Sequence, residues 1–563
     1  MKKTHIYIRR SILFLLLLLP NLYALFQVND LTASPVKSLV YLIVVIICLL
    51  LPALVFKTRT YFIAEGVLSL FCAPIEAASI FLNNETATKS FLSLVYFTDR
   101  QEAGELLASL WFVAIIILAI WIIYFLLASR EEQEWLLPKV VQKTLLVIIP
   151  ILLICGLTVF SVISYNINKE QTAQQILYEA FDKIKLKFYK IYPYNFYINS
   201  FSLFSDERDI TRQEERLYDF SFGIEQQTDT TPTLVVLVIG ETARSANFSL
   251  NGYTRKTNPR LELRNNIISC ANVYSQANLT ELSVPHILSR ITANNHEALY
   301  TEKNVIEAFK EAGYADAWIT NQTAITYTAR NMRNADYVFS STKGLSSVDN
   351  YDIDLMPYFN EALRTLPGNK RFICLHTMGN HWRYDSRYPD EFNIYKPATD
   401  YSFNLTNITV NSKQKLVNAY DNAILYTDFF LDSLISCISS LRYPALVLYL
   451  SDHGENLYDD ENEIVLHGSY IGTRYEYNIP FIIWYSDEYA AAFPDKTEQI
   501  VKHKDLQFNS SVVFHTLLDA AGIIHVADST KSLCHSAFTE ADTMPALTGN
   551  ETLVYITRDS ILH

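Results

Sequence analysis

Five long, nearly uninterrupted apolar runs fill the first third of the chain, and they constrain its fold more than any other feature. Each has about the 20 residues that an α-helix needs to cross a hydrocarbon core. The runs are Ser11–Val28, Ser38–Phe56, Tyr61–Leu82, Leu107–Ser129 and Thr144–Tyr165. We therefore predict a membrane domain of five transmembrane helices within residues 1–165.

Basic residues in the short loops predict the orientation of these helices. Nine of them would lie on one side of the membrane, namely Lys2, Lys3, Arg9, Arg10, Lys57, Arg59, Arg130, Lys139 and Lys143. The opposite side would carry Lys37, Lys89 and Arg100. Cytoplasmic loops are enriched in Lys and Arg, so the amino terminus is expected inside the cell. Five crossings then place the rest of the chain outside the cytoplasm.

The first run also follows a basic amino terminus, as a signal peptide does. No small-residue cleavage site follows it, and four more apolar runs come after it, so we expect this segment to remain as a helix.

Polar side chains occur within and beside the predicted spans. Glu65 and Glu76 fall inside the third run, and an ionisable group at that depth is a functional candidate unless it lies near an interface. The outer loop contains Thr98 and Glu102, which are candidates to present polar groups at the membrane surface. An ordinary solvated helix start, capped by Thr98, is the alternative there.

Residues 166–231 are polar and aromatic, with tyrosines interleaved among lysines. This composition suits an interfacial linker, because amphipathic rings settle at membrane surfaces. A plain helical connector is the alternative.

Residues 232–563 alternate between strand-like and helix-like segments. The expected buried strands are Leu234–Ile239, Ile267–Val273, Ala315–Thr320, Arg371–Thr377, Ala445–Ser451 and Asn478–Trp484. The expected helices are Glu302–Ala312, Leu355–Leu366, Lys413–Ser440 and Asn509–Ala521. Such alternation predicts an α/β domain built as an α/β/α sandwich on a largely parallel sheet.

Charge excludes one class of partner. The net charge is −13, and no basic tract interrupts the predicted outer domain, so no nucleic-acid partner is expected. Four of the seven cysteines lie in that domain, far apart and without a CxxC pair, and they do not indicate a disulfide framework.

Thr280 is the first candidate for chemistry. It stands immediately before the amphipathic run that contains Leu282, Val284 and Ile287, where a helix would begin. The unpaired N–H groups of a helix start favour an alkoxide or a phosphate at that point. Taken alone, Thr280 is as well explained as an ordinary N-cap.

Ligand-type side chains follow two of the predicted strands. Glu241 ends the first strand, and Asp452 and His453 end another, which is the edge where open α/β sheets place their sites. Each alone also suits a helix cap. Together with the Thr280 oxygen they form an oxygen- and nitrogen-rich set that suits Zn²⁺.

Two further histidines extend this set. His381 follows the predicted strand that ends near Thr377, and His467 lies in the sequence VLHG. They are candidates to hold a second ion, a phosphate oxygen or a substrate head group. A metal beside Thr280 would lower the pKa of its hydroxyl, and the chemistry that fits is phosphoryl transfer through a covalent phosphothreonine.

At these residues the sequence resembles the membrane-bound phosphoethanolamine transferases that modify bacterial lipopolysaccharide. These are relatives of the mobile colistin-resistance enzymes within the alkaline phosphatase and sulfatase superfamily. The matching text is GETARSANFSLNGYTRKTNP from Gly240, NLTELSVP from Asn278, MGNHW from Met378, AYDNAILYTD from Ala419, SDHGENL from Ser451 and LHG from Leu466.

The resemblance implies a role for each candidate. Thr280 would be the nucleophile, and Glu241, Asp452 and His453 would bind Zn²⁺ with it, with a second Zn²⁺ as an option. The remaining matches are to substrate-binding positions, namely His381, His467, Thr98 and Glu102. The donor would be phosphatidylethanolamine and the acceptor lipid A or core sugars of lipopolysaccharide. The protein would be a multi-pass monomer among the lipids of the inner membrane, with a periplasmic catalytic domain at residues 232–563.

Some positions depart from that family. Gln276 and His286 stand where many members have a pair of cysteines, so that disulfide is absent. Leu94 replaces an asparagine of some members, and WITNQ from Trp318 lacks the lysine of the colistin-resistance branch. These changes bear on the choice of acceptor rather than on the chemistry.

The sequence also bears on three competing functions. A sulfatase would need an arginine where the motif from Ser283 has Ile287, so this reading is disfavoured. A glycerol-phosphate transferase acting on a periplasmic glucan or a lipid-anchored polymer would share topology, nucleophile and metal. A transporter or scaffold would also need membrane spans, but it has no use for a metal-activated Thr280.

Overall fold

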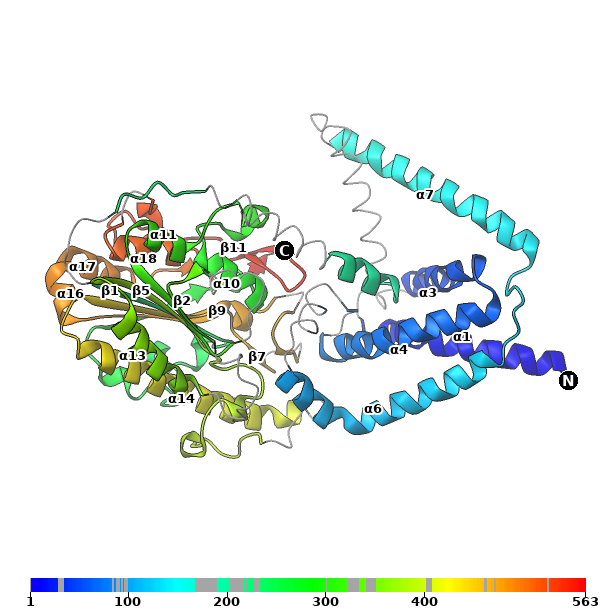
Figure 1. Ribbon diagram of the computed structural model, residues 1–563, viewed down its shortest axis with the longest axis horizontal. Helices are drawn as coiled ribbons and strands as arrows, with labels where there is room; N and C mark the ends of the chain where they lie inside the picture. The colour runs from blue at the N-terminus through cyan, green and yellow to red at the C-terminus, as the bar shows by residue number, and fades with distance from the viewer. Residues whose placement is uncertain are drawn as a thin grey trace. The chain divides into compact units, whose positions relative to one another are not determined.

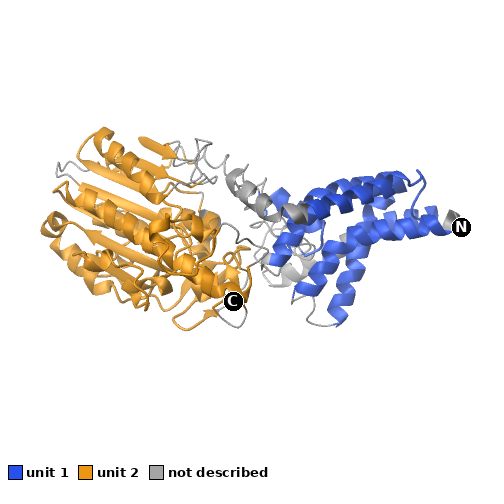
Figure 2. Ribbon diagram, turned by 90° about the horizontal axis from the view of Figure 1, so that it is seen from below, with its two compact units in different colours: residues 1–206 blue, residues 207–563 orange. Residues whose placement is uncertain are grey.

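The chain forms two compact units. A computed structural model describes residues 2–562 except 29–34, 84–85, 88–91, 93–94, 96–99, 168–189, 203–216, 218–219, 227–232, 300, 323–333, 341–350, 401–407, 460–462, 470–471 and 524–525. The first unit is Met1–Asp206 and the second is Glu207–His563 (Figure 2). The division falls inside the segment predicted to be a linker.

The first unit is helical. Its long helices are α1 (Lys2–Gln27), α3 (Pro35–Leu50), α4 (Thr58–Asn83), α6 (Arg100–Ser129) and α7 (Lys139–Ile167). Among the described residues, three helices are long and apolar enough to cross a membrane: Thr4–Gln27, Pro35–Leu54 and Thr58–Phe81. Ile115–Ser129 of α6 is a shorter apolar helix. A helical membrane unit is therefore present, while crossings by α6 and α7 remain a prediction.

Polar contacts join helix ends that the distribution of basic residues predicts to lie on the same side of the membrane. Arg9 and Arg10, near the start of α1, both bind Glu131, which follows α6. At the start of α4, the Thr58 hydroxyl donates to the Glu134 carbonyl at 2.8 Å. The start of α1, the start of α4 and the end of α6 thus share one end of this unit.

The second unit is built on an eight-stranded mixed sheet of order β10-β2-β9-β6-β1-β5-β3-β4 (Figure 1). The six predicted strands form its middle. The strands are β1 (Thr233–Gly240), β2 (Ile267–Tyr274), β3 (Ala315–Thr320), β4 (Tyr337–Ser340), β5 (Lys370–His376), β6 (Ala445–Ser451), β9 (Asn478–Tyr485) and β10 (Phe508–Asn509). Only β9 runs against its neighbours, pairing antiparallel with β2 and β6.

Helices cover both faces of this sheet. Successive β1 residues alternate between two hydrophobic clusters, with Val235 and Leu237 in one and Leu234 and Val236 in the other. The first cluster includes residues of α10 (Thr280–Leu288), α11 (Val305–Glu311), α17 (Pro494–His503) and α18 (Val512–Ala520). The second includes residues of α13 (Met356–Thr365) and α14 (Lys413–Ser439). Because β1 is buried on both faces, its sequence is a continuous apolar run rather than an alternating one.

Smaller elements complete the unit. A three-stranded antiparallel sheet joins β11 (Met544–Leu547), β12 (Leu553–Ile556) and β13 (Ile561–Leu562), and a two-stranded ribbon joins β7 (Asn456–Leu457) and β8 (Val465–Leu466). Two short helices, α15 (Arg474–Tyr477) and α16 (Asp487–Ala492), flank β9. The ribbon follows β6 directly in sequence, so it lies close to the edge where the predicted ligands stand.

Candidate active site

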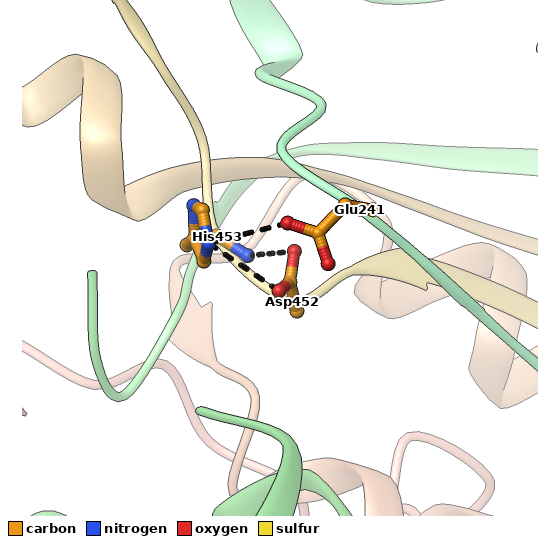
Figure 3. A group of neighbouring side chains, drawn as sticks. All are labelled: Glu241, Asp452 and His453. Atoms are coloured by element: carbon orange, nitrogen blue, oxygen red, sulfur yellow. Dashed lines mark hydrogen bonds and ion pairs between the residues drawn. The ribbon is translucent and has the colours of Figure 1, made fainter. Parts of the chain in front are cut away.

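Two adjacent parallel strands bring Glu241, Asp452 and His453 together. Strand β1 pairs with β6 so that Gly240 lies opposite Ser451, and the next residues along both strands are therefore neighbours. Ligand atoms of Glu241, Asp452 and His453 all lie within 4.8 Å of one another, and all three side chains are buried (Figure 3). Sheet register thus brings Glu241 next to Asp452 and His453, which are more than 200 positions later in the sequence.

The turns after both strands hold these side chains in place. The Thr242 N–H donates to Asp452 Oδ1 at 2.9 Å, and the Thr242 hydroxyl donates to Glu241 Oε1 at 2.6 Å. His453 Nδ1 lies 2.8 Å from the Gly454 carbonyl oxygen, to which it donates as the protonated ring nitrogen. His453 Nε2 is then the ring nitrogen that faces the carboxylates, 3.6 Å from Glu241 Oε1 and 3.4 Å from Asp452 Oδ2.

Gly454 is required by close packing. A Cβ at this position would lie 2.1 Å from the Tyr475 carbonyl oxygen. No side chain fits there without moving the backbone, and that backbone carries His453. The glycine of the SDHGE motif therefore preserves the position of a ligand.

Thr280 lies against this group. It is the first residue of α10, and Leu279 is the N-cap residue. The helix therefore begins one residue earlier than it would if Thr280 were its N-cap. Its Oγ1 lies 3.1 Å from Glu241 Oε1 and 3.1 Å from His453 Nε2. Unlike the buried ligands, Thr280 is partly exposed, so a substrate can reach the hydroxyl.

The cluster carries more negative than positive charge. Burial lowers the pKa of His453, but the carboxylates of Asp452 and Glu241 outweigh burial and hold that pKa above its ordinary value. Asp452 Oδ2 is buried and has no hydrogen-bond partner among the described residues. A buried carboxylate oxygen without a partner is costly. Two carboxylates, one imidazole and one hydroxyl are a donor set that fits a divalent cation.

Sequence reasoning missed Gln322, which orients Glu241. Gln322 Nε2 donates to Glu241 Oε2 at 2.8 Å and to the Thr377 carbonyl at 2.6 Å. Both contacts are buried. Gln322 follows β3 closely, so its position after a strand was the available signal, although an amide there has many ordinary explanations.

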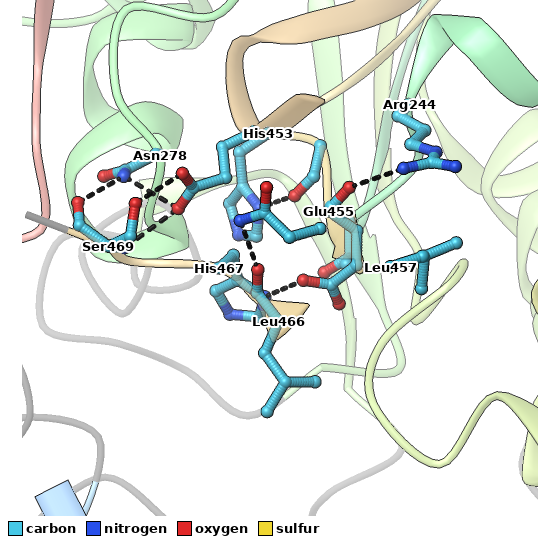
Figure 4. A network of polar contacts seen from close by, with 12 residues as sticks. Arg244, Asn278, His453, Glu455, Leu457, Leu466, His467 and Ser469 are labelled. Carbon is cyan, nitrogen blue, oxygen red and sulfur yellow. Dashed lines mark hydrogen bonds and ion pairs between the residues drawn. The ribbon is translucent and has the colours of Figure 1, made fainter. Parts of the chain in front are cut away.

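His467 lies beside His453, held by a second residue that the sequence did not single out. The two imidazole rings are 4.3 Å apart between centroids. His467 Nδ1 lies 3.1 Å from Glu455 Oε1 (Figure 4). The Tyr384 hydroxyl donates to Glu455 Oε2 at 2.9 Å. Glu455 therefore fixes the ring of His467 next to the ligand group.

His381 is electrostatically coupled to the same group. Burial lowers the pKa of His381 to about 4, with Glu241 opposing the change and His467 adding to it. Burial likewise lowers the pKa of His467 to about 3. Both imidazoles are neutral near pH 7, and in that form they accept hydrogen bonds or bind cations.

The side chains of two candidate residues, Thr98 and Glu102, lie outside the described part of the structure. Thr98 lies outside the described residues, as does Leu94. Glu102 falls in α6, where the backbone is described but the side chain is not. All seven cysteines are free.

Comparison with known proteins identifies the family. The profile of the sulfatase family matches residues 233–523, which is more than half of the chain and covers the large sheet and its helices. The match indicates a shared fold and a shared location of the site. It does not indicate sulfatase activity, because the arginine of the sulfatase nucleophile motif is absent here.

Relatives match beyond this domain. The phosphoethanolamine transferase EptC of Escherichia coli (strain K12) is 26% identical over 511 residues, which cover 87% of this chain and 85% of EptC. The C-terminal periplasmic domain of E. coli EptC, solved in complex with Zn, is 28% identical with a TM-score of 0.53, covering 60% of this chain and 96% of that domain.

A full-length relative has the same two-part fold. The integral membrane protein lipooligosaccharide phosphoethanolamine transferase A (EptA) from Neisseria meningitidis superposes with a TM-score of 0.68 at 20% identity, covering 94% of this chain and 99% of EptA. The resemblance expected from the sequence motifs is confirmed. The chain belongs to the sulfatase family, in its group of membrane-bound phosphoethanolamine transferases.

Proposed function

We propose that this protein transfers phosphoethanolamine from phosphatidylethanolamine to lipid A or core sugars of lipopolysaccharide. The transfer proceeds in two steps through a covalent intermediate on Thr280 and depends on Zn²⁺. The protein is a monomer that crosses the inner membrane five times through residues 1–165. Residues 166–231 form the interfacial linker, and residues 232–563 form a periplasmic catalytic domain.

One observation carries this proposal. The Thr280 hydroxyl, at the start of α10, lies 3.1 Å from both Glu241 Oε1 and His453 Nε2. A binding or transport protein has no need for an accessible alcohol beside a buried group of carboxylates and imidazole. An enzyme that forms a phosphate ester on that alcohol does need it.

Zn²⁺ is the metal that best suits the site. Glu241, Asp452, His453 and Thr280 would hold it, and a domain of the E. coli relative is known as a Zn complex. Bound Zn²⁺ supplies a lowered pKa for the hydroxyl and positive charge for the phosphoryl oxygens. A second Zn²⁺ is an option beside His381 and His467.

In the first step, Thr280 Oγ forms a bond to the phosphorus of the donor lipid while the bond from phosphorus to the glycerol oxygen breaks. The proton of the Thr280 hydroxyl ends on the departing diacylglycerol. In the second step an acceptor oxygen displaces Thr280, which regains a proton. Two displacements give net retention at phosphorus. The low pKa values of His381 and His467 suit them to bind substrate rather than to donate protons.

Headgroup transfer can be tested directly on the full-length protein in lipid nanodiscs. We expect label from ethanolamine-labelled phosphatidylethanolamine to appear on lipopolysaccharide, and fragmentation of the product to place it on lipid A or the core. Thr98 and Glu102 are proposed to hold the donor head group. Transfer of labelled glycerol phosphate from phosphatidylglycerol, with none from phosphatidylethanolamine, would instead favour the glycerol-phosphate transferase.

Gln322 is expected to control metal affinity. In Gln322→Ala, Glu241 loses the amide that fixes its Oε2, and Zn²⁺ affinity should fall about tenfold or more, as is usual when a group that orients a metal ligand is removed. The measurement is competition with a chromogenic chelator. Gln507→Ala is the matched control, because Gln507 is also buried but donates to the Ala541 carbonyl. Equal affinities in the two variants would contradict the assignment.

A further inference from the structure

A buried carboxylate in the membrane unit takes no part in the site described above. Glu76 lies in α4 and is fully buried. It precedes Asn83, the last residue of that helix, by seven positions, or about 10 Å along the axis. The other end of α4 begins at Thr58, on the side proposed to face the cytoplasm. Glu76 therefore stands near the outer end of its helix.

Only one oxygen of this carboxylate is satisfied. Glu76 Oε2 accepts the Ala87 N–H at 3.0 Å and the Asn195 amide Nδ2 at 2.7 Å. Glu76 Oε1 is buried and has no hydrogen-bond partner among the described residues, and no ion pair joins Glu76 to any of them. An ionisable group left in this state inside a membrane is costly, and it is usually functional.

Two asparagines leave matching carbonyl oxygens beside it. Asn195 and Asn199 lie four residues apart in the helix at 194–202, on one face of it, and both are fully buried. Their Nδ2 atoms both donate to the Ala87 carbonyl, at 3.3 Å and 3.0 Å. These contacts fix which amide atom is nitrogen, so the other atom of each side chain is an oxygen. Both Oδ1 atoms lack a partner in the part of the chain that the structure describes.

The three side chains therefore offer unsatisfied acceptors and one negative charge, while the buried hydroxyls of Ser79 and Tyr192 also have no partner among the described residues. Glu76, Asn195 and Asn199 are all hydrogen-bonded to the backbone of Ala87, and the remaining oxygen of each side chain is left without a partner among the described residues. A ligand that satisfies three acceptor oxygens and compensates a carboxylate must be cationic and carry several N–H donors. A primary ammonium group has three such donors and a single positive charge.

We propose that Glu76, Asn195 and Asn199 form a binding site for the primary ammonium group of an ethanolamine phospholipid. The proposal rests on the function proposed above, in which Thr98 and Glu102 hold the donor head group, and adds residues that bind the ammonium group of that head group. Its position near the outer end of α4 suits the depth of a lipid head group. A choline head group has no N–H donor, and it would leave all three oxygens unsatisfied.

The test measures head-group preference without turnover. Full-length Thr280→Ala protein is placed in phosphatidylglycerol nanodiscs that contain equal small amounts of phosphatidylethanolamine, its N-methyl and N,N-dimethyl derivatives and phosphatidylcholine. Lipids retained by the protein are then quantified by mass spectrometry. We expect retention to fall with each added methyl group, with phosphatidylethanolamine favoured over phosphatidylcholine about tenfold or more, as befits hydrogen bonds to a charged group.

Glu76→Gln and Asn199→Ala, each made in the same background, should lose this preference. Glu65→Gln should retain it, because Glu65 lies in the same helix about three turns earlier, away from Ala87. Equal retention of the four lipids, or an unchanged preference in correctly folded Glu76→Gln and Asn199→Ala, would overturn the site.

A turnover assay separates this inference from the proposed function. If the protein with Thr280 intact transfers no head group but Thr280→Ala still selects phosphatidylethanolamine through Glu76, the ammonium site stands and the transferase proposal fails. If transfer is normal and Glu76→Gln leaves both the KM for the donor and the head-group preference unchanged, the transferase stands and the ammonium site fails.

Discussion

Thr280→Ala should abolish transfer of phosphoethanolamine. The Thr280 oxygen would form the bond to phosphorus, and no other hydroxyl among the described residues is hydrogen-bonded to both Glu241 and His453. Loss of a nucleophile lowers kcat on the order of 10⁴-fold or more. The measurement is transfer of labelled head group by full-length protein. Thr280→Ser keeps an oxygen in place and should retain measurable activity.

The covalent step gives this prediction a second readout. Wild-type protein exposed to donor lipid without acceptor should gain the mass of one phosphoethanolamine on the peptide that contains Thr280. Thr497→Ala is the matched control, because the Thr497 hydroxyl donates to the Pro494 carbonyl within α17, away from the ligand group. Full transfer by Thr280→Ala would remove the nucleophile from the proposal, whereas a full biological effect of Thr280→Ala in cells without any transfer would favour a transporter or scaffold.

Much of the catalytic fold could be predicted because its central strands are buried on both faces. Strand β1 has the sequence TLVVLVIG, and every residue of it is buried, so apolar content alone marks it. The carboxyl ends of such strands are then the expected location of a site, which is how Glu241, Asp452 and His453 were found.

The rest depended on information that hydropathy does not contain. Strand β9 was located, but its antiparallel direction depends on the path of the chain between β8 and β9. The strands of the β11-β12-β13 sheet are apolar but only two to four residues long, too short for hydropathy to mark, and they were missed. Gln322 and Glu455 were also missed, because their roles arise from single contacts with Glu241 and His467 that form only in the folded domain.

In the membrane unit the sequence marked the functional candidate but not its partners. Glu76 was singled out because a carboxylate is rare in an apolar run. Asn195 lies in a segment predicted to be an interfacial linker, and no pattern connects it to a residue more than one hundred positions earlier. The contact of 2.7 Å between them is a property of tertiary packing alone.

Removal of metal should inactivate the enzyme and also destabilise its catalytic domain. Glu241 and Asp452 are buried side by side, and without a cation their mutual repulsion is offset mainly by His453. A ligand at 100 times its Kd stabilises the folded state by about 2.7 kcal/mol. Exhaustive chelation should therefore lower the Tm of the catalytic domain by several degrees. Added Zn²⁺ should restore both the Tm and the transfer activity.

Two variants show whether this stabilisation comes from the proposed ligands. Asp452→Asn removes a negative charge and a strong ligand, so its Tm should respond little to added Zn²⁺ and its activity should stay low. Asp428→Asn is the matched control, because Asp428 is equally buried but accepts the N–H groups of Arg260 and Leu261. This variant should keep the full shift in Tm on addition of Zn²⁺, whatever its own stability. The opposite outcome is protein that elemental analysis shows to be metal-free but whose Tm and activity are unchanged. The buried cluster would then stabilise the fold without a cation, and Thr280 would need a different activating group.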